Sequence, residues 1–231
     1  MCCIDVLEHI EPELIDNVIA ELARITGLSA QTISVIIREL EADGLLEKGE
    51  PQRGRVGQPS VPMGLRAEGA YFLGLKVGRR SLDMVLIDFL GRVVGRTHKT
   101  HSHPDPDGVV AFAGEAMAAL LASLSADQRA RVGGLGIALP FQLWDWAVPL
   151  GVEQSAMDRW RDRDIGADIG RGLDFPVYIR NDASAACGAE LAFGHGNNPA
   201  DFLYFFVGFF IGGGMVLNNR LYTGRTGNAA A

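Results

Sequence analysis

Residues 21–46, ELARITGLSAQTISVIIRELEADGLL, decide how the first part of this chain folds. The pattern predicts two helices and a tight turn. The first helix ends near Thr26, and Gly27 supplies the turn because glycine tolerates a positive φ. Ser29 then caps the second helix, since its hydroxyl accepts from a backbone N–H that the helix leaves unpaired. Apolar residues recur on that helix with the helical period and predict one buried stripe, made of Ile33, Ile36, Ile37 and Leu40.

The opposite face of the second helix predicts contact with base edges of DNA. It carries Gln31, Val35 and Arg38 and is flanked by Thr32 and Ser34. Side chains at the start of the second helix of a helix-turn-helix lie in the major groove. A β-branched apolar residue among polar neighbours fits contact between Val35 and a thymine methyl group. The alternative is an incidental exposed valine on an ordinary helical hairpin.

The flanking segments extend this hairpin into a winged helix. Residues 4–20 are expected to be helical, with Pro12 separating two short helices because proline suits a first turn but not a helix interior. Gly44 ends the second helix, and residues 45–48 predict a short strand. In the Gly- and Pro-rich residues 49–62 a hairpin would form the wing, with Arg53 and Arg55 placed to enter a narrow minor groove. The alternative is a solvated linker.

Composition limits the functions open to the chain. Its 231 residues suffice for one large or two modest domains, and 48% of them are hydrophobic. No apolar run reaches membrane-spanning length, and the acidic N-terminus does not resemble a signal peptide, so we expect no membrane partner. Cys2, Cys3 and Cys187 are odd in number and lack metal-ligand spacing, which indicates reduced thiols in a cytoplasmic protein.

The charge of the chain argues against non-specific DNA binding. The net charge is −7, and residues 1–66 carry eleven acidic and six basic side chains. However, six of those acids precede Arg24, in the part farthest in sequence from the expected DNA face. Affinity depends on where charge lies rather than on its total. We therefore expect weak non-specific binding and dependence on a dimer.

After residue 66 the periodicity changes from helical to strand-like, and the order of elements is α/β. Asp107 is expected to cap the first long helix of this part. Strands are predicted at residues 71–77, 82–88, 92–100, 132–139, 176–179, 201–207, 212–217 and 220–222, and helices at 107–124, 164–172 and 182–193. The last two strands form a hairpin across Asn218 and Asn219.

Three histidines lie close together in sequence. His98, His101 and His103 are followed by Asp105 and Asp107, which makes a metal site conceivable. The stretch is polar and interrupted by proline, so we predict no metal there.

Four stretches together resemble the ROK family, which groups sugar-responsive repressors with sugar kinases. They are TGLSAQTISVIIRELEADGLL with RGRVGQPSVP, GLKVGRRSLDMVLIDFLGRV, RNDASAACGAELAFG and GGGMVLNNRLYTGRTGNA. The resemblance implies a winged helix-turn-helix over residues 1–66, with the wing and linker at 49–66, and a ROK domain over residues 67–231. That domain implies the first lobe of an actin-like, sugar-kinase type of fold and the start of a second lobe that is truncated here.

The phosphate side of the resemblance departs from the kinases. There the first strand ends in a D-x-G-x-T-K loop, whose aspartate helps to hold magnesium. Here residues 76–81 read KVGRRS, and Lys76 cannot ligate a cation. The second phosphate loop carries Phe209 and Phe210 where close backbone approach is needed. Phosphoryl transfer depends on positioned metal and phosphates, so we predict no kinase activity and no cofactor. Lys76, Arg79 and Arg80 either bind an anion or form a solvated turn.

The sugar side matches the family better. Asn181 and Asp182 correspond to its Asn-Asp pair, in which the asparagine holds a sugar hydroxyl and the aspartate acts as base. Without ATP the carboxylate of Asp182 still accepts from hydroxyls, although it alternatively caps its helix. Gly227 and Asn228 resemble the start of the G-N-A-G-E-x-G-H sugar loop of the family.

Aromatic residues flank these motifs. Trp144 and Trp146 offer flat faces for a sugar or, alternatively, pack in the core. The apolar residues that begin the second lobe have no visible partner, and exposed they are an aggregation hazard, which leads us to expect a truncated chain. They are Phe202, Leu203, Phe205, Phe206, Phe209 and Phe210.

The resemblance therefore predicts a sugar-responsive DNA-binding transcriptional regulator, a repressor. Its expected partners are a double-stranded DNA operator, a small-molecule sugar effector and a second copy of the full-length chain. A sugar at Asn181 and Asp182 would change lobe closure and reposition the DNA-binding heads, as a population shift. Two alternatives stay open: an ATP-dependent hexose kinase, and a sugar-binding module whose winged helix mediates protein contacts.

Overall fold

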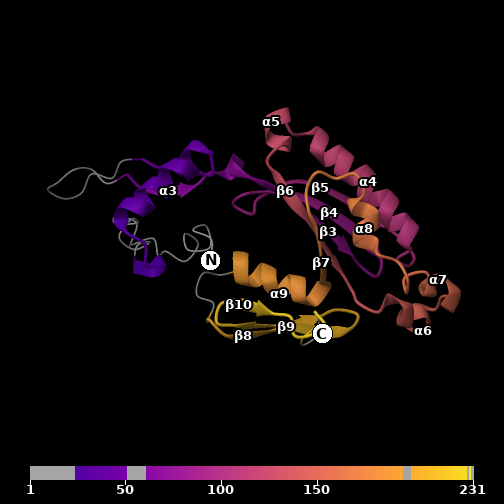
Figure 1. Cartoon of the computed structure of the whole chain (residues 1–231). Helices are drawn as coiled ribbons and strands as arrows, with labels where there is room; N and C mark the ends of the chain where they lie inside the picture. The colour runs from indigo at the N-terminus through magenta and orange to yellow at the C-terminus, as the bar shows by residue number, and fades with distance from the viewer. Residues whose placement is uncertain (1–23, 51–60, 195–198, 228, 230–231) are drawn as a thin grey trace. The chain divides into compact units, whose positions relative to one another are not determined.

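The chain divides into two compact units, Met1–Ala70 with Asp88–Leu90 and Tyr71–Ile87 with Gly91–Ala231. The computed structural model describes residues 24–50, 61–194, 199–227 and 229 (Figure 1). The predicted helices over residues 4–20, the wing tip with Arg53 and Arg55, and Asn228 lie outside these ranges. Within them, every helix is too short or too polar to cross a bilayer.

The first unit contains the second helix of the predicted hairpin, α3 (Ala30–Ala42). Ser29 caps it as predicted, because its Oγ accepts from the backbone N–H of Thr32 at 3.1 Å. Gly27 and Gly44 flank this segment with φ values of 71° and 72°, where a side chain would be strained. Of the apolar stripe, Ile33 is fully buried and the other three residues are half-buried. A short η2 (Ala67–Gly69) leads out of the unit.

A two-stranded hairpin follows α3. Strand β1 (Leu46–Lys48) pairs antiparallel with β2 (Met63–Leu65), so that Leu46 lies opposite Leu65 and Lys48 opposite Met63. The strands that flank the predicted wing therefore pair as a winged helix requires.

The second unit is built on a five-stranded sheet in the order β5-β4-β3-β6-β7. Its strands are β3 (Tyr71–Val77), β4 (Ser81–Asp88), β5 (Val93–Thr100), β6 (Val132–Leu139) and β7 (Val177–Asn181). β3, β6 and β7 run parallel, whereas β4 and β5 pair antiparallel. Three of the neighbouring strands thus end at the same edge of the sheet.

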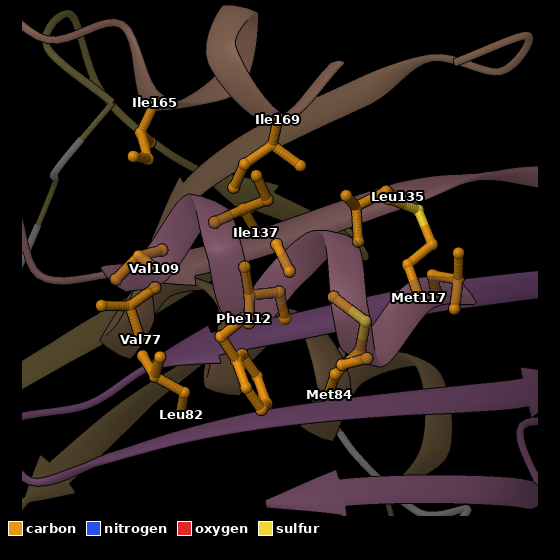
Figure 2. Packing of buried hydrophobic residues seen from close by; sticks show 14 of the residues in the cluster. Val77, Leu82, Met84, Val109, Phe112, Met117, Leu135, Ile137, Ile165 and Ile169 are labelled. Carbon is orange, nitrogen blue, oxygen red and sulfur yellow. The ribbon is translucent and has the colours of Figure 1, made fainter. Parts of the chain in front are cut away.

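Helices α4 (Pro106–Ala122) and α8 (Ile165–Gly170) lie along one face of this sheet (Figure 1). The period of two along each strand sends Leu73, Leu75 and Val77 of β3 into the core and leaves Lys76 on the opposite face. Figure 2 shows the core side chains of α4, α8 and the sheet packed together; Val109, Phe112, Met117, Met84, Leu135, Ile137, Ile165 and Ile169 are among them.

The prediction that Asp107 caps α4 is wrong, because Asp105 does so. Its Oδ2 accepts from the backbone N–H of Gly108 at 2.8 Å. Pro106 occupies the first turn, where its missing N–H costs nothing, and this moves the cap two residues earlier. Asp107 instead accepts hydrogen bonds from Arg159 and Arg163.

A second, three-stranded sheet has the order β10-β9-β8 and is antiparallel. Its strands are β8 (Phe202–Val207), β9 (Ile211–Leu217) and β10 (Arg220–Tyr222), and α9 (Asp182–Phe193) packs on it (Figure 1). Gly214 permits this packing, since an added Cβ would lie 2.3 Å from Cβ of Cys187 on α9. Asn218 and Asn219 form the predicted hairpin turn with φ values of 51° and 56°.

Four short helices complete the described part of the unit. They are α5 (Ala126–Arg129), η3 (Leu143–Trp146), α6 (Ala147–Leu150) and α7 (Gln154–Asp158). Just beyond α7, Trp160 fastens this region to the start of α4, because its Nε1 donates to the carbonyl of Pro104 at 2.9 Å.

Candidate functional site

The outward face of α3 is open to solvent. Val35 is 43% exposed, and Gln31, Thr32 and Arg38 are exposed as well, whereas Ser34 is half-buried. These residues share one face because they recur three and four positions apart. The predicted DNA-reading residues on α3 are therefore grouped as the sequence required.

Hydrogen bonds already engage some of these side chains. Thr32 Oγ1 lies 2.9 Å from Ser29 Oγ at the cap, and Ser34 Oγ donates back to the carbonyl of Ala30 at 2.8 Å. Arg38 Nε donates to the carbonyl of Ser34 at 3.0 Å, which leaves its terminal nitrogens for a ligand. Gln31 and Val35 are thus the side chains best placed for a new contact.

Charge on α3 is distributed unevenly along its length. Its first turn carries no acidic residue, whereas Glu39, Glu41 and Asp43 gather at its C-terminal end. Glu41 is paired with Lys48 of β1 at 2.6 Å. The N-terminal half of α3 is therefore the half that a phosphate backbone approaches without repulsion.

A cleft lies at the carboxyl ends of the parallel strands. Lys76 of β3 lies opposite Ala138 of β6, and Asn181 of β7 lies opposite Leu139. In open α/β sheets this edge is where ligands bind. A cavity of about 480 Å³ opens there; it is lined by Lys76, Gly78, Arg79, Arg80, Pro140, Phe141, Gln142, Trp146, Asn181, Asp182, Ala183, Phe206, Gly208, Phe209, Phe210, Ile211 and Gly212.

Two predicted ligand residues, Asn181 and Asp182, lie together in this cleft. The side chain of Asn181, 6% exposed, caps α9 by accepting from the backbone N–H groups of Ala183 and Ser184 at 2.9 and 3.1 Å. Asn181 is therefore the N-cap, although Asp182 Oδ1 also accepts from Ala183 N at 3.0 Å. Capping orients the amide of Asn181 and leaves the half-buried Asp182 at the cleft.

The electrostatics of Asp182 reflect its position. Burial raises its pKa above the usual range, and the backbone N–H of Ala183 and the charge of Lys76 oppose that rise. Because burial makes this carboxylate costly to ionise, a hydrogen bond from a ligand hydroxyl would stabilise its charged form.

One wall of the cleft is formed by a guanidinium group and three aromatic rings in successive contact. The guanidinium carbon of Arg79 lies 4.2 Å from the ring centroid of Phe209. Phe209 meets Phe210 edge-on with centroids 4.9 Å apart, and Phe210 meets Trp146 at 4.7 Å. Trp146 thus serves as part of an aromatic wall. From the sequence, Phe209 and Phe210 are predicted only to disrupt the phosphate loop, and nothing there indicates that Arg79 lies over the ring of Phe209.

A second cavity of about 570 Å³ shares the segment 140–142 with the cleft. Trp144 and Thr226 line it, and Gly227 adjoins it, because an added Cβ there would lie 3.7 Å from Phe141. Gln142 lines both cavities and has a φ of 57°, which is unusual for a residue with a side chain. Sequence reasoning missed Gln142, since nothing in the residue type announces a left-handed backbone.

The three histidines do not form one cluster. His98 Nδ1 lies 2.9 Å from Asp83 on β4, and His103 Nδ1 lies 3.1 Å from the hydroxyl of Ser102. Both ring nitrogens of His101 are buried and have no hydrogen-bond partner among the described residues. Among the described residues, no three His, Cys, Asp or Glu side chains lie together so that they could hold a metal ion.

Comparisons with known proteins agree with both parts of this arrangement. The ROK family profile matches residues 72–231, and the MarR family profile matches residues 18–55. The xylose repressor of Bacillus subtilis is 25% identical over 209 residues, which cover 90% of this chain and 53% of the repressor. The chain thus spans about half the length of the curated relatives it matches.

Solved structures show the same fold. The crystal structure of a ROK family transcriptional regulator, a homolog of the E. coli MLC protein, has a TM-score of 0.66 at 24% identity and covers 97% of this chain and 56% of its own. A ROK family glucokinase from Streptomyces griseus, in complex with glucose and AMPPNP, has a TM-score of 0.54 at 24% identity and covers 70% of this chain and 49% of its own. The predicted α/β fold, a helix-turn-helix followed by part of an actin-like sugar-kinase fold, is confirmed. With 160 of its residues inside the family profile, this chain belongs to the ROK family.

Proposed function

We propose that the protein is a sugar-responsive transcriptional regulator, a repressor, that binds a double-stranded DNA operator as a homodimer. The observation that carries the proposal is the solvent-exposed face of α3, with Val35 at its centre, on the same chain as the Asn181–Asp182 cleft. Residues 1–66 would form the winged helix-turn-helix and residues 67–231 the ROK domain. The relatives named xylose repressor support a sugar as effector.

The DNA contacts follow from the side chains. Gln31, Thr32, Ser34, Val35 and Arg38 would meet the major groove, with Val35 against a thymine methyl group. Arg53 and Arg55 would reach the minor groove from the wing.

The sugar would bind at Asn181 and Asp182, with Gly227 and Asn228 at the adjoining loop. Its hydroxyls donate to the carboxylate of Asp182, which burial otherwise penalises. Binding that favours one closure of the lobes shifts the population of the DNA-binding arrangement. Whether the sugar promotes or weakens DNA binding depends on which of the two closure states it binds more tightly.

Catalysis is not part of this proposal. Lys76 stands at the end of β3, where the kinases of the family need a carboxylate for magnesium, and Phe209 and Phe210 fill the second phosphate loop. Both changes lie on the nucleotide side of the cleft. Phosphoryl transfer depends on a positioned metal ion and nucleotide phosphates, so these two changes lead us to expect no kinase activity.

A gel-shift titration with the DNA upstream of the protein's own gene tests the proposal. Val35→Asp brings a carboxylate to the phosphates and removes the methyl contact, and we expect roughly 100-fold weaker operator binding. Val94→Asp is the matched control, because Val94 is 52% exposed on β5 and the substitution has the same chemistry. Equal affinity of wild type and Val35→Asp would overturn the assignment of α3.

A sugar kinase is the alternative, favoured by the shared fold and by Asp182 in the cleft. Incubation with ATP, Mg²⁺ and a panel of hexoses separates the two functions. We expect no sugar-dependent ADP release. Turnover that disappears in Asp182→Asn would establish the kinase instead.

A further inference from the structure

Three cationic side chains line the cleft and outnumber its single carboxylate, that of Asp182. Lys76, Arg79 and Arg80 come from the end of β3 and the turn into β4. Across the ranges that the structure describes, none of the three forms an ion pair. Several other arginines of the same unit form ion pairs; Arg96, for example, lies 2.6 Å from Asp83. The cleft thus gathers three cations without ion pairs on one short stretch of the chain.

Arg79 is also held in place. Its guanidinium stacks on Phe209, and that ring in turn contacts Phe210. Stacking fixes the plane of the guanidinium while its N–H donors, which point outward in that plane, stay available for an anion. A freely solvated turn would not restrain Arg79 in this way. The contacts thus favour anion binding over a solvated turn.

The charge of the cleft indicates what kind of anion would fit. Lys76, Arg79 and Arg80 face a single carboxylate, Asp182, in a chain whose net charge is −7. A phosphate monoester carries a charge of about −1.5 to −2 at neutral pH and three acceptor oxygens. A phosphate monoester would neutralise the excess positive charge of the cleft, whereas a sugar carboxylate would leave part of that charge unbalanced. The cavity of about 480 Å³ lies within the usual size of small-ligand sites.

We infer that the effector is a monosaccharide phosphate, whose hydroxyls meet Asn181 and Asp182 and whose phosphate is held by Lys76 and Arg79. This inference rests on the proposed function and specifies its ligand. The side of the cleft that has lost the residues for magnesium and nucleotide phosphates then carries an anion subsite of its own.

Isothermal titration of the full-length protein tests the inference. The probes are glucose 6-phosphate, fructose 6-phosphate, ribose 5-phosphate and xylulose 5-phosphate, each compared with its parent sugar, together with glucuronate and inorganic phosphate. We expect at least one sugar phosphate to bind tenfold or more tightly than its parent sugar. Lys76→Gln and Arg79→Gln should each weaken that binding about tenfold, which corresponds to one charge-assisted contact. Lys99→Gln, on the exposed β5, is the control and should change nothing.

The outcomes separate this inference from the proposed function. Parent sugars that bind as tightly as their phosphates, or Lys76→Gln and Arg79→Gln proteins that bind normally, would overturn the phosphate subsite. Preferential binding of glucuronate would overturn it too. If a neutral sugar alone changes operator affinity in the gel shift, the proposed function stands and the inference fails. If the protein binds a sugar phosphate but does not bind operator DNA, the proposed function is overturned instead.

Discussion

The face of α3 and the cleft both present polar side chains to a ligand, but they are built in different ways. Gln31 to Arg38 follow one another on a single capped helix, so their common face follows from the helical period alone. The cleft is assembled from four segments that lie far apart in sequence, at residues 76–80, 140–146, 181–183 and 206–212. A surface of the first kind depends on local structure, and one of the second kind depends on tertiary packing.

The packing of α9 on β9 provides the sharpest test of that difference. Gly214→Ala would place a Cβ 2.3 Å from Cβ of Cys187, and we expect the second unit to lose about 3 kcal/mol of stability, the upper range for overpacking. All three tryptophans lie in that unit, so urea unfolding followed by their fluorescence measures it. Cys187→Gly removes the opposing Cβ, and Gly214→Ala combined with it should recover part of the loss. Full stability of Gly214→Ala alone would contradict the close approach.

The ion pairs between β4 and β5 carry the next largest effect. Burial raises the pKa of Asp83, but hydrogen bonds from Arg96, His98 and Ser81 outweigh it and lower the pKa from 3.8 to about 2. The group therefore adds stability above pH 3.8 that is lost as the pH falls through about 2. Because Arg96 is exposed, we expect Asp83→Asn to cost only about 1–2 kcal/mol at pH 7.

Urea midpoints at pH 7 and pH 2 measure this contribution. Wild type and Asp83→Asn should differ at pH 7 and converge toward pH 2. Asp174→Asn serves as the control, because Asp174 is exposed and forms no ion pair in the described part of the chain. A constant difference between wild type and Asp83→Asn at both pH values would refute the linkage.

The cap of α3 tests the local side of the comparison. Ser29→Ala removes the acceptor for the N–H of Thr32 and should destabilise the helix by about 1 kcal/mol. Hydrogen exchange of the α3 amides reports the change. Ser34→Ala removes only a bond back to the carbonyl of Ala30 and should leave protection unchanged. Equal effects of the two variants would show that the cap does not hold the helix.

The smallest expected effect comes from His101. Burial lowers its pKa below 6.5, and the nearby backbone of Ser81 and His103 opposes that shift only in part. Burial therefore disfavours the charged form of His101 in the folded protein. Stability is full above pH 6.5 and falls as the pH drops toward the lowered pKa, because the unfolded chain then binds more protons. His101→Gln should reduce the change of the thermal unfolding midpoint between pH 7 and pH 5. An unchanged pH dependence would count against the lowered pKa of His101.

The contrast between local structure and tertiary packing also explains which features could be predicted from the sequence. The residues of α3, its cap at Ser29 and the strands of both sheets follow local periodicity and turn chemistry, and most bounds agree within one or two residues. The cap of α4 is Asp105 and not the predicted Asp107, because Pro106 occupies the first turn of the helix and the cap must precede it. In the cleft, Asn181 and Asp182 are predicted as ligand residues from the family resemblance. The stacking of Arg79 on Phe209, by contrast, joins segments 130 residues apart. No local pattern encodes such a contact.

The ion pairs of Asp107 have a consequence for the two cavities. Arg163 lines the second cavity, yet it donates to Asp107 and Asp168 at 2.8 and 2.7 Å, so two carboxylates already balance its charge. The second cavity is therefore lined mainly by apolar side chains, with Asp164 as its other charged residue, while the cleft on the other side of Gln142 keeps its surplus of positive charge. A molecule that occupied both would need a mainly apolar part on one side of Gln142 and an anionic part on the other.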